Sequence, residues 1–440
     1  MEQNPKPHTT NKIKRALVYS ATAILIAVCS FFIGFSAHYL TLDKELRSLM
    51  QLKERIQEQY YYEVDDEKFY KVLFDAVNQN ILDEYSAYLT AEEYAAMQES
   101  AKGAQQGIGI SFITKTADGK DQLLVSSVLG NSPAEQAGIC AGERVLGYGD
   151  SEQELTASEN FDTFKAFVDS KRTGDTLYLN VRARTGEERI VALVKSAYTE
   201  NYVYYKTNTS SYGFTGNNAQ TLTPRGEPLA VLPNDTAYVQ LTRFNGAAAE
   251  EFSTALRQFK TDGKKNLVLD LRGNGGGYLD IMQKISAYFC KGATEKNPLA
   301  AVADFGEYKE YYKASGNFYA DYFSADSRIC VIADKNTASA SECLLGVMLD
   351  YNAITYQDIC LIERDGEART YGKGIMQTTY PLIGFTGEAV KLTTAQIRWP
   401  KSDNCIHGRG VLPADGALTV AENGMGDEEL IAAINALLSK

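Results

Sequence analysis

The chain has 440 residues, a length that predicts two or three folded units with terminal segments rather than one core. Its hydrophobic fraction of 44% and charged fraction of 23% are those of an ordinary globular protein, which excludes global disorder. The formal charge of -12 argues against a nucleic-acid partner, because phosphate binding needs concentrated Lys and Arg side chains.

An uncharged apolar run separates Arg15 from Asp43, and basic residues precede it. At about 1.5 Å per residue this run can span a bilayer, so residues 16–40 are predicted to form a transmembrane helix. By the positive-inside rule, residues 1–15 stay cytoplasmic and the part after Asp43 is extracytoplasmic, as in a single-pass protein of a bacterial-type cell membrane. Small residues at 34–37 leave a cleaved signal peptide as the alternative.

Residues 41–102 have apolar side chains at three- and four-residue spacing, as at Leu46 and Leu49, which predicts a helical arm. Such an arm is a candidate dimerisation element for a homodimer. Residues 103–195 change to short β-rich runs such as GIGISFI and LYLNVRA, and these runs predict a small β-rich domain. Residues 196–236 have weak periodicity and are interpreted as an elaborated connection.

Strands and helices alternate over residues 237–440. The hydrophobic runs NLVLDLRG and RICVIAD are each followed by a helical pattern, which predicts a largely buried sheet covered by helices. The predicted fold class is therefore α/β and multidomain.

Histidine is scarce, which limits the possible chemistry. His8 and His38 lie before or inside the apolar run, so a histidine-based mechanism has only His407. The motifs HExxH and GxSxG are absent, and the seven cysteines include no CxxC or zinc-type spacing. We therefore expect no metal site and no cofactor. For the cysteines outside the apolar run, disulfides and buried thiols both stay open.

Ser339 lies where the strand RICVIAD ends and a helix begins. A serine at a helix N-terminus faces free backbone N–H groups, which stabilise developing negative charge, although serine is also an ordinary helix N-cap.

Lys373, between two glycines, is the available base if burial makes it neutral, and Gln377 could orient its amine. A solvated turn is the alternative for the lysine segment. The glycine run 275–277 follows another strand and can present N–H groups to an oxyanion.

Together these segments resemble the carboxyl-terminal processing (tail-specific) serine peptidase family. Residues 83–93, Gly107–Ile110, Ser132–Ile139 and parts of 392–415 also resemble motifs of that family. The resemblance implies a PDZ domain at 103–195 and a β/α protease core of the ClpP/crotonase-like type at 237–440.

The resemblance also implies residue roles. Ser339 would be the nucleophile, Lys373 the general base and Gln377 the residue that orients the lysine. The oxyanion donors would be the backbone N–H groups of Ala340 and Gly276. The PDZ domain would capture the C-terminal carboxylate of a protein or peptide with an exposed, apolar tail. Its carboxylate-binding loop would be formed by Gly107, Ile108, Gly109 and Ile110.

Three alternatives stay open. Residues 351–372 form a longer stretch than the family usually has, and an insertion there could alter access to the lysine. Cys343, one helical turn after Ser339, could act as a cysteine nucleophile with His407. The whole chain could instead be a catalytically inactive, membrane-tethered PDZ adaptor that binds exported C-termini.

Overall fold

The computed structural model describes residues 43–117, 120–316, 318–382, 386–421 and 427–439, with scattered residues between 19 and 31. The chain divides into two compact units, residues 1–82 and 83–440. The transmembrane helix predicted at 16–40 lies largely outside the described residues. Among the residues that are described, we find no helix with both the length and the apolar character needed to cross a membrane.

The smaller unit contains helices α2 (Lys44–Gln59) and α3 (Asp66–Asn80). Each begins at an aspartate N-cap: Asp43 accepts a backbone N–H at 3.1 Å and Asp65 accepts one at 2.7 Å. The helical arm was predicted to reach residue 102, whereas residues 83–102 belong to the larger unit. They form strand β1 (Ala87–Leu89) and helix α4 (Ala91–Ala101) there.

A β-rich module follows, with strand order β3-β4-β5-β7-β8 and β6 paired to β5. Helices α5 (Pro133–Gln136) and α6 (Phe161–Ser170) accompany the sheet, and Phe164 of α6 is buried in the module's core. A separate pair, β2 with β9, joins the two ends of the module. The strands are β2 (Ala104–Gly107), β3 (Ile110–Ala117), β4 (Lys120–Val128), β5 (Arg144–Gly149), β6 (Thr156–Ala157), β7 (Thr176–Arg182), β8 (Glu188–Val194) and β9 (Ser196–Thr199).

The rest of the larger unit is built on an eight-stranded sheet of order β12-β11-β10-β13-β14-β17-β18-β21. The five strands from β13 to β21 are parallel, and they form the largely buried sheet that the β/α alternation predicts. The 196–236 connection adds three antiparallel strands to this sheet, and the 351–372 stretch supplies β18. The strands are β10 (Val203–Lys206), β11 (Ser211–Thr215), β12 (Asn218–Pro224), β13 (Thr236–Leu241), β14 (Asn266–Asp270), β17 (Ile329–Asp334), β18 (Ile359–Ile362) and β21 (Leu418–Val420).

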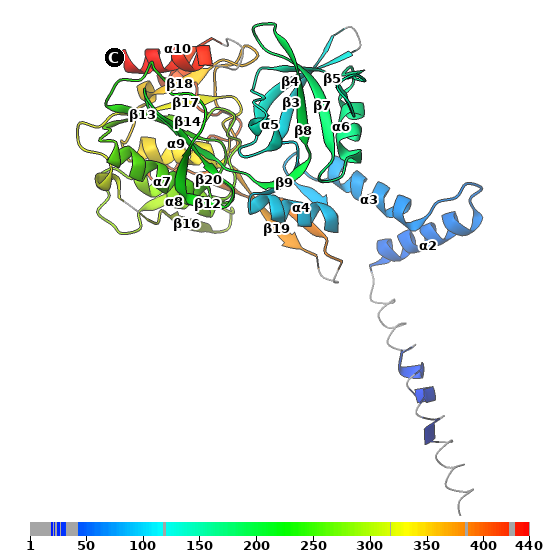
Figure 1. Cartoon of the computed structure of the whole chain (residues 1–440). Helices are drawn as coiled ribbons and strands as arrows, with labels where there is room; N and C mark the ends of the chain where they lie inside the picture. Colours follow the sequence, from blue (N-terminus) through cyan, green and yellow to red (C-terminus); the bar gives the residue numbers. More distant parts are fainter. Residues whose placement is uncertain are drawn as a thin grey trace, which may run out of the picture. The chain divides into compact units, whose positions relative to one another are not determined.

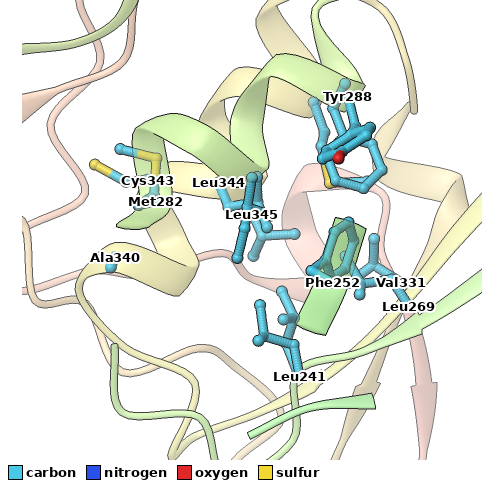
Figure 2. Close-up of a cluster of buried hydrophobic side chains, with 14 of the residues drawn as sticks. Leu241, Phe252, Leu269, Met282, Tyr288, Val331, Ala340, Cys343, Leu344 and Leu345 are labelled. Atoms are coloured by element: carbon cyan, nitrogen blue, oxygen red, sulfur yellow. The ribbon is translucent and has the colours of Figure 1, made fainter. Parts of the chain in front are cut away.

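Helices cover both faces of this sheet (Figure 1). Helices α7 (Ala248–Thr261), α8 (Leu279–Ser286) and α9 (Ala340–Asp350) pack on one face, and α10 (Asp427–Leu438) packs on the other. Side chains of β14 alternate accordingly: Leu269 joins the first cluster and Val268 the second. Figure 2 shows the first cluster, with Phe252 beside Leu269 and Val331.

A second, five-stranded sheet has the order β1-β20-β15-β16, with β19 also paired to β20. Its strand β19 begins two residues after Lys373, so the predicted base lies just before a paired strand. The strands are β15 (Leu299–Asp304), β16 (Lys309–Lys313), β19 (Ile375–Pro381) and β20 (Ala389–Arg398). Among the described residues, the structure records no disulfide.

Candidate active site

Ser339 lies on a sharp turn between β17 and α9. Its backbone has φ 57° and ψ -115°, a combination that is strained for any residue other than glycine. The side chain is half-buried, and the next residue, Ala340, begins the helix. No described residue accepts the N–H of Ala340, which therefore stays available to an oxyanion.

Lys373 is half-buried beside an aromatic ring. Its Nζ lies 4.9 Å from the ring centre of Tyr85, a residue of the 83–93 segment. Burial, followed by the positive charge of Lys391, lowers the pKa of Lys373 below its ordinary 10.5, while Asp83 and Glu342 act in the opposite direction. A lowered pKa increases the neutral fraction that a general base requires.

Ser339 and Lys373 line the same cleft, whose volume is about 1220 Å³. Ala340, Gly277 and Gln377 also line it, so most of the predicted site residues are brought together. Apolar side chains form part of its wall: Ile281, Cys343, Ile375, Met376 and Ile397. An apolar substrate side chain is compatible with this wall.

Glu342 connects the two halves of the site, a role that we did not predict. Its buried carboxylate accepts the backbone N–H groups of Ser339 (3.0 Å), Lys373 (2.9 Å) and Gly372 (2.8 Å), and the hydroxyl of Thr370 (2.6 Å). Burial raises the pKa of Glu342, although these hydrogen bonds lower it. The sequence signal was the Ser-x-x-Glu spacing of a helix capping box.

Gly276 packs tightly against the nucleophile loop. Its φ is 99°, and an added Cβ would lie 2.8 Å from Ser339 Cβ and 2.9 Å from Ala340 N. Its own N–H, predicted as an oxyanion donor, instead donates to Asn274 Oδ1 at 3.0 Å. No described residue accepts the N–H of Gly277, which follows it in the cleft wall.

Gln377 also differs from its predicted contact. Its Nε2 donates to Thr393 Oγ1 on the paired strand β20 at 3.4 Å, and the structure records no hydrogen bond from it to Lys373 among the described residues. Thr393 in turn donates its backbone N–H to Ser86 Oγ at 2.8 Å. In this structure Gln377 is therefore tied to the strand pair rather than to the amine.

The alternative Cys343/His407 pair is not assembled. Cys343 lines the cleft, but burial raises its pKa to about 12, which disfavours the reactive thiolate. His407 is exposed and, among the described residues, lines a separate hollow with Tyr371 and Gly372. The described part of the chain contains no cluster of three or more His, Cys, Asp or Glu side chains suited to a metal ion.

In the β-rich module, the Gly107–Ile110 segment connects β2 to β3, which is an edge strand of its sheet. The carbonyl groups of Ile108 and Gly109 accept N–H groups from Ala134 (3.0 Å) and Leu129 (2.9 Å). Within the described ranges no residue accepts the N–H groups of Ile108 and Gly109. The loop therefore presents free backbone donors beside an open strand edge.

The strained serine, the half-buried lysine and their shared cleft are compatible with a serine-type peptidase. Residues 235–415 match the sequence model of peptidase family S41. A "Probable CtpA-like serine protease" of Staphylococcus saprophyticus is 25% identical over 400 residues, covering 89% of this chain and 70% of the relative. One of Staphylococcus aureus (strain COL) is 26% identical over 395 residues, covering 89% and 69%.

The solved structure of the photosystem II D1 C-terminal processing protease has a similar fold, with a TM-score of 0.50 and 22% identity. The match covers 88% of this chain and 92% of that chain. The match to the peptidase family S41 model and the CtpA-like relatives together show that the chain is a serine-type peptidase. The resemblance to carboxyl-terminal processing serine peptidases is confirmed.

Proposed function

We propose that the protein is an extracytoplasmic endopeptidase that recognises C-terminal tails of exported proteins and cleaves them with Ser339 and Lys373. The observation that carries the proposal is the shared cleft, in which one carboxylate, Glu342, holds the backbone of both residues. The uncharged run at 16–40 supports attachment to the cell membrane, with the catalytic part outside the cytoplasm.

In the proposed mechanism, neutral Lys373 takes the proton of Ser339 as Oγ attacks the substrate carbonyl carbon. The resulting ammonium then donates that proton to the leaving amine, and water releases the acyl-enzyme. Ala340 N–H stabilises the oxyanion. The Gly276 N–H can donate to the oxyanion only if it gives up its hydrogen bond to Asn274 Oδ1. The Gly277 N–H has no acceptor among the described residues and needs no such change.

Tail recognition is proposed for the β-rich module, acting as a PDZ domain. The open edge of β3 suits strand addition by an extended peptide, and the free N–H groups of Ile108 and Gly109 suit its terminal carboxylate. Phe112 of β3 packs edge-on against Phe164 of α6, with ring centres 5.3 Å apart. These aromatic side chains lie beside the strand edge, where the proposal places the tail's last side chain.

Cleavage of an unstructured protein with a free, apolar C-terminus, compared with its C-terminally amidated twin, tests this proposal. Preferential cleavage of the free form supports tail recognition, and equal cleavage contradicts it while leaving the peptidase activity intact. Absence of cleavage, together with absence of labelling at Ser339 by a fluorophosphonate probe, contradicts the Ser339 assignment and is the result expected of an inactive adaptor.

A further inference from the structure

The C-terminal helix α10 reaches the catalytic end of the central sheet through a buried ion network. Glu429 of this helix, with a fully buried carboxylate, lies between Arg272 and Arg364. Asp270 and Asp334, the last residues of β14 and β17, complete the network. None of the five side chains is more than 14% exposed.

Glu429 is the shared acceptor of the two arginines. Arg364 donates from Nη1 to Oε2 and from Nη2 to Oε1, both at 2.6 Å, and Arg272 donates from Nη1 to Oε1 at 2.8 Å. Two-point arginine–carboxylate contacts fix orientation as well as distance. Glu429 therefore sets the spacing between two guanidinium groups that would otherwise repel each other.

The network continues into the loops of the active site. Arg364 Nε donates to Asp334 Oδ2 at 3.3 Å. The other oxygen of Asp334 accepts the backbone N–H of Gly273, which opens the glycine loop, and that of Asn336, which lies three residues before Ser339, both at 3.0 Å. These two loops are also joined directly, since Ala338 N–H donates to Asn274 O at 3.0 Å.

We propose that Glu429 is a positioning residue for Ser339, acting through Arg364 and Asp334 on the nucleophile and glycine loops. This inference rests on the proposed function of Ser339. The charges are not the only attachment of α10, because its side chains Leu430, Ile434 and Leu437 are also buried against the sheet. A buried ion network is also a weak source of stability compared with apolar packing.

The charge state of Glu429 is consistent with this role. Burial acts to raise its pKa, but the hydrogen bonds and charges of Arg364 and Arg272 outweigh burial and lower it. Among the groups that shift the pKa of Lys373, none belongs to the network. Loss of Glu429 is therefore expected to slow the attack by Ser339 without changing the pH at which Lys373 becomes neutral.

The test compares Glu429→Gln with Ile434→Val, a buried substitution on the same helix outside the network. We expect Glu429→Gln to slow single-turnover acylation by a fluorophosphonate at least tenfold, with the midpoint of the pH profile and KM for a peptide unchanged. Ile434→Val should stay within twofold of the wild type. An equal rate in both variants overturns the inference.

Two further measurements distinguish failure of the Glu429 inference from misfolding of the variant and from failure of the Ser339 assignment. Amide hydrogen exchange should be faster at 335–339 and 273–277 in Glu429→Gln than in Ile434→Val, and unchanged exchange in both segments also overturns the inference. If Glu429→Gln does not fold, Arg364→Lys, which loses the two-point contact, should show the same effects. A wild-type chain that is not labelled contradicts the proposed function of Ser339, while hydrogen exchange still decides whether Glu429 orders the loops.

Discussion

The carboxylate of Glu342 accepts the backbone N–H of Lys373 at 2.9 Å, across 31 residues of sequence. The same oxygen, Oε2, accepts the backbone N–H of Ser339, so a single atom fixes the backbone on both sides of the cleft. All four groups that contact this carboxylate are donors. An amide in its place would direct its own N–H atoms at some of them.

Glu342→Gln is therefore expected to reduce acylation of Ser339 by one to two orders of magnitude. It should also lower the free energy of unfolding by about 1–3 kcal/mol, the usual cost of an unsatisfied buried polar group. Probe labelling and chemical denaturation measure the two effects. Glu250→Gln is the matched control, because Glu250 lines the same cleft and is exposed. Equal activity in both variants would show that the Glu342 contacts are dispensable.

The proposed base makes the reaction dependent on pH. Only the neutral amine of Lys373 accepts a proton, so the acylation rate should rise with pH and level off above the pKa of Lys373, with a midpoint below 10.5. Lys391→Gln removes a positive charge that lowers this pKa, and the midpoint should move to higher pH. Lys284→Gln, in the same cleft but not among the groups acting on Lys373, should leave it unchanged. A midpoint unaffected by Lys391→Gln contradicts this electrostatic account.

Two glycines of the same loop offer a steric test. Gly276 and Gly273 both have positive φ, 99° and 69°, so alanine should cost about 1–3 kcal/mol of backbone strain at either position. Only at Gly276 would the added Cβ meet the nucleophile loop, since nothing lies within 4 Å of a Cβ at Gly273. We expect Gly276→Ala to abolish acylation and Gly273→Ala to retain most of it. Similar losses in both would show that strain, not contact with Ser339, limits activity.

The serine and cysteine mechanisms predict opposite effects on peptidase activity when Cys343 or His407 is replaced. Cys343→Ala and His407→Ala should each retain peptidase activity within a few-fold, because Cys343 has a raised pKa and His407 lines a different hollow. Hydrolysis of a peptide substrate by the two variants measures this. Loss of activity in both, with Ser339→Ala still active, would favour the cysteine.

Local sequence patterns predicted the parts of the site that directly follow a strand along the chain. The serine after RICVIAD and the glycine run after NLVLDLRG both follow strands of the central sheet, where the carboxyl ends of parallel strands bring loops together. The β/α alternation likewise predicted a largely buried sheet and the helices that cover it. These features follow from hydrophobic periodicity and turn residues alone.

Contacts between distant segments were not predictable from one sequence. Glu342 and Glu429 accept hydrogen bonds from Lys373 and Arg364, which are far from them along the chain. Gln377 contacts Thr393 because of the register of β19 with β20. The 351–372 stretch, interpreted as an insertion, contains a strand buried between β17 and β21. Its pairing depends on the whole sheet rather than on its own composition.

The central claim is that Ser339 attacks the substrate and Lys373 removes its proton. Labelling with a fluorophosphonate probe, followed by mass spectrometry of the modified peptide, tests it most directly in the wild type, Ser339→Ala and Lys373→Ala. The account predicts modification at Ser339 in the wild type, none in Ser339→Ala, and a rate at least a hundredfold lower in Lys373→Ala. Unchanged labelling in Lys373→Ala, or labelling at a residue other than Ser339, would contradict it.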